Sequence, residues 1–331
     1  MRGSIQAVGR PLAAVLAAAA LVAVAGCGGE QEAATAASSG PQTTKLRVSY
    51  VPATTVLPLH VAEQQGFFDK QGLDVTLQEA ANISDVPATL GRQFDIALGT
   101  ATDLIKAGGA GVDVVQIAGN TIDTKDNPFV QLMVRKDQSA KIKSVADLAG
   151  KKVGTPTLGG VIHAAVQYSA RQQGLDPSRI QGVEAPSPTL PDQLKAGRID
   201  AVEALEPFAT TMKRNGAVSL GDPFASIGQP LATNFWIADG AWARANRDVV
   251  GRYVGALEEA VAYIESNSKR ARRILQGYTN MPRKVSQIVP LPTYDLAIRA
   301  GDLTRWIDVL ADVGQFKGDV DPQRLVLSGA G

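Results

Sequence analysis

A pattern that occurs twice in the chain constrains the fold more than any other feature. Residues 48–52 end in a proline and are followed by a helical stretch and by Gln-Gly-Leu-Asp at 71–74. Residues 153–156 also end in a proline, and Gln-Gly-Leu-Asp returns at 173–176. Each copy is typical of a strand, a proline-containing loop and a helix. The chain is therefore expected to contain two similar α/β units.

A second pair of segments supports this duplication. Residues 87–97 and 191–202 both have the pattern of a helix followed by a buried strand. Chance similarity between alanine- and glycine-rich segments is the alternative. Two pairs of similar segments that occur in the same order favour an internal repeat. Alternating strands and helices predict an α/β fold with two mainly parallel sheets flanked by helices. The predicted strands are 45–51, 94–98, 112–118, 152–154, 199–204 and 232–238, and the predicted helices are 58–65, 248–267 and 301–313.

The loops that follow the predicted strands are candidates for a ligand site. In open α/β sheets, ligands bind beyond the carboxyl ends of the strands, where helix N-termini offer free N–H groups. Two such units that face each other form a cleft, and such interfaces are favoured places for ligands. Four loops are expected to converge there: residues 52–58, 99–103, 155–161 and 203–208.

The side chains of these loops are polar but weakly charged. Hydroxyl groups and backbone amides can hold a small oxyanion or the edge of a polar ring, and glycine permits close approach of the backbone. Each threonine taken alone is better explained by a cap or a turn, but together on convergent loops they favour binding. Because the four loops contain no Lys or Arg, a modest anion, a zwitterion or a neutral heterocycle is expected rather than a phosphate. The candidate ligand-binding residues are Thr54, Thr55, Thr100, Thr102, Asn120, Thr157, Gly159, Gly160, Glu206 and Phe208.

Two acids and two histidines have more than one interpretation. Glu203 and Glu206 lie in the last loop, where a carboxylate could meet an amine or ring N–H of a ligand. Glu206 could equally cap the helix that follows. His60 and His163 occupy equivalent places near the two helix starts. Ordinary surface or capping histidines are expected there rather than ligand contacts.

Several classes of function find no support in the sequence. Two histidines and one cysteine are a poor basis for a zinc site. A P-loop, a nucleophile elbow and a dinucleotide glycine fingerprint are all missing, so neither a cofactor nor catalysis is expected. The chain is nearly neutral and has no basic run, which gives no reason to expect nucleic-acid binding. No apolar stretch after the N-terminal segment is long enough to span a membrane, which argues against a permease.

The N-terminal segment predicts export and lipid anchoring. Arg2 and Arg10 precede an apolar run of about 14 residues, too short to span a bilayer and typical of a secretory signal. Residues 24–27 resemble the bacterial lipobox, in which the cysteine is lipidated and becomes the new N-terminus. Cys27 is the only cysteine in the chain. An ordinary signal peptide with a chance cysteine is the weaker alternative. Residues 28–44 are rich in Ala, Gly, Ser, Thr and Gln and are typical of a flexible tether.

Further motifs resemble one family of binding proteins. They are residues 50–55, 58–75, 94–100, 144–154 and 206–208, in this order and spacing. The chain resembles the periplasmic binding proteins that serve ABC importers for aliphatic sulfonates, taurine, nitrate and thiamine-type pyrimidines.

This resemblance implies a two-lobed type II fold with two crossover strands, near residues 130–135 and 232–238, and closure at a hinge. It implies binding roles for Thr54, Thr55, Thr100, Thr102, Thr157 and Glu206. It also implies a monomer outside the cytoplasm, held to the cell membrane by a lipid on Cys27, which passes a small solute to an ABC permease. A sulfonate or taurine-like ligand is expected first. The expected boundaries are 1–26 for the signal peptide, 27–44 for the lipidated cysteine and tether, 45–132 and 235–331 for the first lobe, and 133–234 for the second.

Two rival functions use the same fold. Pyrimidine synthases of the eukaryotic thiamine pathway share it, but they carry a cysteine-rich motif, and this chain has no cysteine after residue 27. A surface sensor or adhesion lipoprotein is the other rival. Neither is the expected function, and the chain is expected not to be an enzyme.

Overall fold

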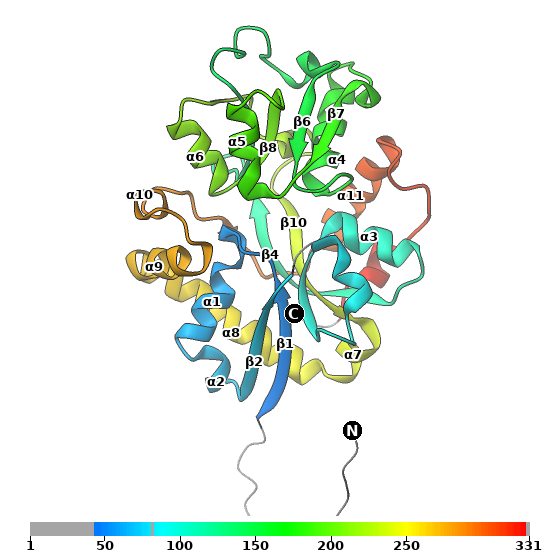
Figure 1. The fold of residues 1–331 in the computed structure, drawn as a ribbon. Helices are drawn as coiled ribbons and strands as arrows, with labels where there is room; N and C mark the ends of the chain where they lie inside the picture. The colour runs from blue at the N-terminus through cyan, green and yellow to red at the C-terminus, as the bar shows by residue number, and fades with distance from the viewer. Residues whose placement is uncertain (1–42, 81–82, 329–331) are drawn as a thin grey trace, which may run out of the picture. The chain divides into compact units, whose positions relative to one another are not determined.

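The computed structural model describes residues 43–80 and 83–328. The predicted signal peptide, Cys27 and the tether up to residue 42 lie outside the described residues. The described chain forms two α/β units, each built around its own sheet, and the first unit is made from both ends of the described chain (Figure 1).

The first sheet has six strands in the order β11-β4-β10-β3-β1-β2. Strand β1 pairs in parallel with both β2 and β3, while β10 runs antiparallel to β3 and β4. The strands are β1 (Thr44–Tyr50), β2 (Leu73–Glu79), β3 (Ile96–Thr100), β4 (Val114–Asp123), β10 (Leu231–Asp239) and β11 (Thr293–Tyr294).

The second sheet has five strands in the order β7-β6-β8-β5-β9. Strand β6 pairs in parallel with β7 and β8, and β5 runs antiparallel to β8. The strands are β5 (Val130–Val134), β6 (Lys152–Thr155), β7 (Gln181–Glu184), β8 (Ala201–Leu205) and β9 (Val218–Ser219).

The duplicated pattern of the sequence is visible in this topology. In the order β3-β1-β2 the first strand of the unit lies in the middle, and the order β8-β6-β7 repeats this arrangement. The two Gln-Gly-Leu-Asp sequences lie at equivalent turns, and Gly72 and Gly174 both take a positive φ, of 65° and 79°. Glycine has no side chain to oppose that conformation, which explains why both copies have it there. The predicted α/β class is confirmed.

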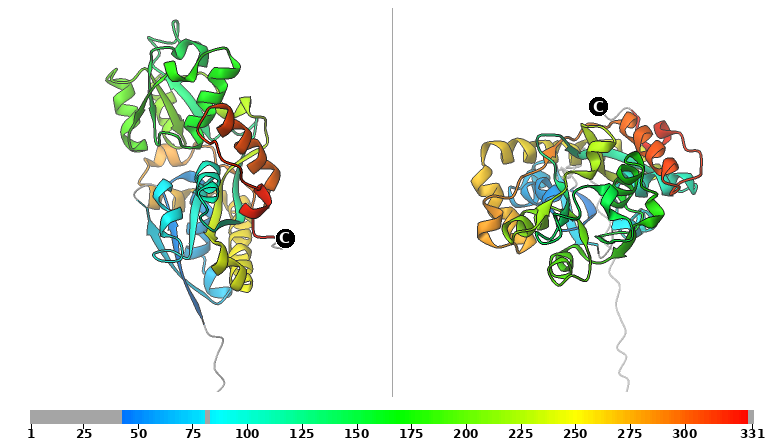
Figure 2. Two further views of the ribbon diagram at one scale, coloured as in Figure 1. Left: turned by 90° about the vertical axis from the view of Figure 1, so that its right-hand side faces the viewer. Right: turned by 90° about the horizontal axis from the view of Figure 1, so that it is seen from above.

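Helices cover both faces of each sheet (Figure 1). Around the first sheet they are α1 (Leu57–Gln64), α2 (Phe67–Lys70), α3 (Ala101–Gly109), α7 (Gly240–Ala245), α8 (Arg247–Ser266), α9 (Ser268–Thr279) and α10 (Arg283–Ser286). Those of the second sheet are α4 (Val161–Gln172), α5 (Leu190–Lys195) and α6 (Phe208–Arg214). Helix α11 (Ala300–Asp312) packs against both α3 and α4 (Figure 2). Short 3-10 helices occupy 54–56, 83–85, 87–89, 145–148, 177–179, 187–189, 223–226 and 322–325.

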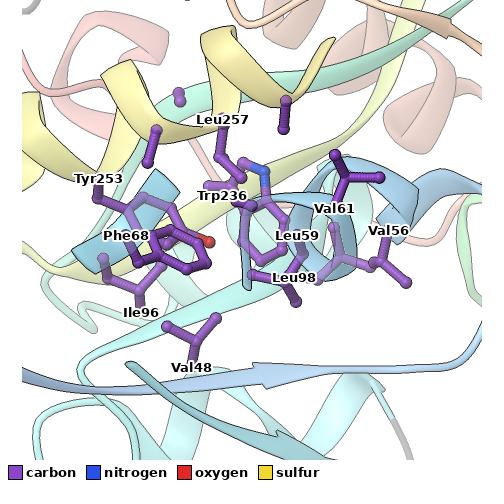
Figure 3. Packing of buried hydrophobic residues seen from close by; sticks show 14 of the residues in the cluster. Val48, Val56, Leu59, Val61, Phe68, Ile96, Leu98, Trp236, Tyr253 and Leu257 are labelled. Carbon is purple, nitrogen blue, oxygen red and sulfur yellow. The ribbon is translucent and has the colours of Figure 1, made fainter. Parts of the chain in front are cut away.

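The tryptophan of β10 lies at the centre of the core between the first sheet and α1, α2 and α8 (Figure 3). Trp236 is fully buried, and its ring meets the edge of Tyr253 on α8 at 5.7 Å between centroids. Trp306 of α11 is also fully buried, and its Nε1 donates to the carbonyl of Ala232 at 2.8 Å. This bond satisfies the buried indole N–H of Trp306, whereas the Nε1 of Trp236 has no hydrogen-bond partner among the described residues. Neither tryptophan lines the cleft, so both serve the core of the fold.

The chain passes between the sheets twice, at residues 124–129 and 220–230. The crossover strands expected near 130–135 and 232–238 are β5 and β10, and each belongs wholly to one sheet. The crossings therefore occur just before these strands rather than within them, because β5 pairs along its whole length with β8, and β10 pairs from its first residue with β4.

Two carboxyl groups meet where the chain crosses. Asp123 ends β4 and accepts a hydrogen bond from the backbone N–H of Phe129, and Asp222 lies on the second crossing. The Nε2 of Gln229 donates to Asp123 and, at 2.6 Å, to Asp222. Burial, followed by the hydrogen bond with Asp222 and its negative charge, raises the pKa of Asp123 to about 8. The two crossings are thus joined by a carboxyl pair that holds a proton.

This pair predicts a pH dependence of stability. Because Asp123 holds its proton in the folded state up to about pH 8, its contribution to stability is present below about pH 4 and is lost as the pH rises through about 8. Asp123→Asn removes the titration. The unfolding free energy of the variant relative to wild type should therefore rise with pH between 5 and 8, by up to about 1.4 kcal/mol per pH unit. Urea unfolding at several pH values measures this. The exposed carboxyl control Asp319→Asn should give a flat difference, and a flat difference for Asp123→Asn would refute the shared proton.

A second prediction concerns Gly119 of β4. A Cβ there would lie 2.3 Å from the carbonyl oxygen of Asp295 and 2.6 Å from that of Ala297. Backbone cannot move aside as the end of a side chain can, so Gly119→Ala should lower the unfolding free energy by about 2 kcal/mol or more. The matched control is Gly251→Ala on α8, where a Cβ meets nothing within 4 Å. It should raise stability by up to about 1 kcal/mol, since alanine favours helix. Equal effects in urea unfolding would contradict this packing.

Candidate functional site

A cleft of about 990 Å³ is lined by residues from both sheets. The segments that form its wall on the first sheet follow the carboxyl ends of β1 and β3, and those on the second sheet follow β6, β7 and β8. Since parallel strands within a sheet end at the same edge, the loops after them gather there. Duplicated units thus bring two sets of loops to one cavity.

Five of the predicted binding residues line the cleft. Thr55 and Thr100 come from the first sheet's loops. Thr157, Gly160 and Phe208 come from the loops of the second sheet. The structure therefore brings together residues that lie more than 150 positions apart in the sequence.

The other five predicted residues do not line the cleft. Thr54 is buried, and its carbonyl accepts a hydrogen bond from the Tyr294 hydroxyl at 2.8 Å. Thr102 is fully buried, with its hydroxyl 2.9 Å from that of Thr100. The Nδ2 of Asn120 donates to the Oδ1 of Asn234 at 2.8 Å. These groups lie behind the wall, where they support it.

The remaining two are occupied by contacts within the protein. The carbonyl of Gly159 accepts a hydrogen bond from the Nζ of Lys106 at 2.7 Å. Glu206 is buried, and its Oε2 accepts from the backbone N–H of Thr210 at 3.0 Å. Of the two interpretations of Glu206, the geometry favours the helix cap.

Sequence reasoning missed part of the wall. Residues 278–282, between α9 and α10, line the cleft although they lie far along the chain. So do residues 184–188, which follow β7, and Asn234 of β10. The proline-rich stretch after β7 gave a signal for a loop, and the strand containing Asn234 was predicted. The sequence around 278–282 contains no repeat partner and gave no such signal.

Both histidines are buried, which corrects the expectation that they lie on the surface. The ring of His60 stacks on Tyr278 at 3.9 Å between centroids, and Tyr50 meets it edge-on. Burial lowers the pKa of His60 to about 4, so the ring is neutral near pH 7. His60 stands behind Tyr278, a residue of the cleft wall, and supports it from within the core.

The second histidine forms a buried pair with Glu203. The Nδ1 of His163 lies 2.8 Å from the Oε1 of Glu203, and both side chains are buried. Burial alone would lower the pKa of His163, but the charge and hydrogen bond of Glu203 raise it above its ordinary value. A buried carboxylate is costly unless paired, so this histidine stabilises Glu203. Neither residue lines the cleft.

The cleft contains one carboxylate in its interior. Asp103, in the first turn of α3, is half-buried and lines the cavity. Its Oδ2 accepts a hydrogen bond from the Thr100 hydroxyl at 2.6 Å, and Ser84 donates a second. Burial raises the pKa of Asp103, while these hydrogen bonds and the charge of Lys106 act in the opposite direction. Asp103 ends the loop 99–103, which was expected to reach the cleft, but it was not among the predicted binding residues.

Other kinds of site are not supported in the described part of the chain. Residues 43–80 and 83–328 hold no group of three or more His, Cys, Asp or Glu side chains placed to bind a metal ion. None of the helices described is both long and apolar enough to cross a membrane.

The chain is similar in sequence to proteins of two kinds: some are named as binding proteins and others as synthases. YtlA of Bacillus subtilis, named as a binding protein, is 27% identical over 244 residues, which cover 69% of this chain and 68% of YtlA. The pyrimidine phosphate synthase THI11 of Saccharomyces cerevisiae is 23% identical over 236 residues, which cover 68% of this chain and 67% of THI11.

Solved structures of other proteins are similar to the fold of this chain. The alkanesulfonate-binding protein SsuA of Xanthomonas axonopodis superposes with a TM-score of 0.73 at 18% identity, over 86% of this chain and 98% of SsuA. The periplasmic nitrate-binding protein NrtA of Synechocystis gives a TM-score of 0.71 at 14% identity, over 85% of this chain and 84% of NrtA. The fold predicted from the sequence motifs, that of the periplasmic binding proteins, is thereby confirmed.

A family model identifies the group to which the chain belongs. The family described as NMT1/THI5 like matches residues 53–271, which is more than half of the chain and includes loops of both walls of the cleft. The chain is therefore a member of the NMT1/THI5-like family, built on the fold of the periplasmic binding proteins.

Proposed function

We propose that this chain is an extracytoplasmic solute-binding lipoprotein that delivers a small organic solute to an ABC importer. The observation that carries the proposal is the cleft of about 990 Å³, lined from both sheets by loops after strand ends. A cavity of this size suits a small organic molecule. The names of SsuA, NrtA and YtlA, all binding proteins, support the same role.

Closure of two lobes around the ligand is the proposed mechanism. We assign each sheet to one lobe, so that the chain changes lobe at the crossings 124–129 and 220–230; the expected boundaries at 132/133 and 234/235 would divide β5 and β10. Ligand contacts on both walls favour the closed arrangement, because only there can one molecule touch both. A permease that recognises the closed form then receives loaded protein.

Contacts away from the cleft also join the two proposed lobes. Lys106 of α3 donates to the Gly159 carbonyl, and the Nε2 of Gln315 donates to the Oε1 of Gln167 at 2.7 Å. Arg171 of α4 donates to the carbonyl of Asp312 at 2.9 Å. These hydrogen bonds stabilise the closed arrangement, as contacts with the ligand do. They lie near the place where α11 packs against α3 and α4.

An enzyme of the synthase type is the second candidate, since THI11 carries that name. The pyrimidine synthases of this kind carry a cysteine-rich motif, whereas Cys27 is the only cysteine here. Among the described residues, the cleft wall has only Asp103 as an interior carboxylate, and both histidines lie outside it. Solute capture needs neither a cysteine-rich motif nor further titratable groups in the cleft, and it therefore fits the described residues better than the synthase reaction does.

Capture can be tested with a panel of solutes. Taurine, alkanesulfonates, nitrate, pyrimidines and aromatic acids are each added to the purified domain, and the thermal transition is measured. A solute that binds only the folded state should stabilise it by about 2.7 kcal/mol at 100 times its dissociation constant. It should also lower the radius of gyration in small-angle scattering. If no small solute shifts the transition or the scattering, capture is excluded.

The anchor can be tested separately at Cys27. In a bacterial host that processes lipoproteins, the wild-type chain should fractionate with membranes, because its lipid inserts in the bilayer. Cys27→Ser should release the protein from the membrane fraction and remove the mass of the lipid. The tether variant Thr35→Ala should behave as wild type. Membrane association of Cys27→Ser equal to that of wild type would contradict lipid anchoring.

A further inference from the structure

The charges on the cleft wall have one sign. Four acidic side chains line the cavity: Glu79, Asp103, Glu184 and Asp192. Among the described residues of the wall there is no Lys, Arg or His. Sites for sulfonates, phosphates and carboxylates generally use arginine or lysine, because these side chains offer charge together with N–H donors. An anion entering this cleft would meet carboxylates and no cation.

Asp103 is the acid best placed to contact a ligand. Glu79, Glu184 and Asp192 are exposed, and Glu184 already accepts a hydrogen bond from the backbone N–H of Leu158 at 2.7 Å. Asp103 is half-buried beside Thr100, so water screens its charge less than theirs. Its carboxylate accepts from two hydroxyls, which fixes its orientation and leaves acceptor capacity free.

The nearest cation points elsewhere. Lys106 lies one turn further along α3 and does not line the cleft. Its Nζ donates to the Gly159 carbonyl at 2.7 Å and to the Oε1 of Gln315 at 3.2 Å. Lys106 therefore eases the burial of Asp103 through its charge but forms no ion pair with it that would block a ligand.

A polar group with no partner stands in the same wall. Thr55 is only 6% exposed and lines the cleft, and its hydroxyl forms no hydrogen bond with any described residue. The hydroxyl is therefore available to a ligand, as donor or as acceptor, and is compatible with a cation or an anion. The ionised carboxylate of Asp103 can only accept hydrogen bonds, and a sulfonate has no proton to donate to it.

The rest of the wall suits an apolar or aromatic body. Aromatic rings and prolines from both sheets line the cavity: Phe129, Phe208, Phe224, Tyr278, Pro156, Pro186, Pro188 and Pro282. Phe129 and Phe224 are themselves in contact, at 6.0 Å between centroids. Aromatic faces also attract cations, which adds to the effect of the carboxylate.

We propose that the cleft takes an organic cation, with an ammonium or amidinium group paired to Asp103 and a flat or apolar body held by the aromatic wall. This inference rests on the proposed function of solute capture. It names a ligand class different from the sulfonates expected from the sequence resemblance, and it assigns Asp103 as the residue that determines that class.

Four probes with a common phenyl ring test the proposal: benzamidine, benzamide, benzoate and benzenesulfonate. The first three also share a planar head group, so their calorimetric dissociation constants compare charge and hydrogen-bond donors, and benzenesulfonate adds the tetrahedral anion. Benzamidine should bind at least about 10-fold more tightly than benzamide, because a charge-assisted hydrogen bond replaces a neutral one. Benzoate and benzenesulfonate should bind more weakly than benzamide.

The variant Asp103→Asn keeps the shape of the side chain and removes its charge. It should weaken benzamidine binding about 10-fold or more and leave benzamide within about 2-fold. The control Asp126→Asn changes the net charge equally, at an exposed turn outside the cleft, and should leave benzamidine binding unchanged. Binding of benzamide by Asp103→Asn verifies that the variant is folded.

The outcomes separate this inference from the function on which it rests. If an anion binds as tightly as benzamidine, or benzamidine binding survives Asp103→Asn, the cation site is excluded while solute capture stands. If neither these probes nor any solute of the panel binds, both are excluded. Selective benzamidine binding that depends on Asp103, but not on Asp126, supports both.

Discussion

The structure depends most on the pairing of β10 with β3 and β4. After the chain leaves the second sheet, β10 joins the first sheet between β3 and β4, which lie more than 100 residues earlier in the sequence. Its Trp236 fills the core on one face, and Asn234, near its start, reaches the cleft. Without β10 the first sheet would be split between β3 and β4, and the cleft would lose part of its floor. Core stability and site geometry therefore rest on the same hydrogen bonds.

The sequence predicted elements and loops better than it predicted side-chain directions. The two copies of the repeat predicted two similar α/β units, and the strands around β1 and around β6 are indeed arranged alike, since hydrophobic periodicity and Gly-containing turns are local signals. It did not distinguish Thr55, in the wall, from Thr54, behind it, because a 3-10 turn has no simple alternation of faces. The contribution of residues 278–282 depends on how α9 packs, which is a long-range property that no local pattern encodes.

A shared fold does not imply a shared ligand. SsuA and NrtA have names that specify alkanesulfonate and nitrate, yet at 18% and 14% identity their similarity extends to the fold alone. The fold fixes where the loops converge, whereas the charge of the cavity depends on a few side chains in them. Here those side chains are hydroxyls, aromatic rings and four acids.

The position of Lys106 links ligand choice to closure. Its ammonium group is the cation that acts on Asp103, and it reaches across to Gly159 in the loop after β6. Lys106 also donates to Gln315 of its own proposed lobe, so separation of the lobes would break only the hydrogen bond to Gly159. Closure therefore gives the ammonium group a second partner, which holds it out of the cavity wall. A closed cleft then presents Asp103 to a ligand cation with no lysine in the described wall, so closure and cation binding favour each other.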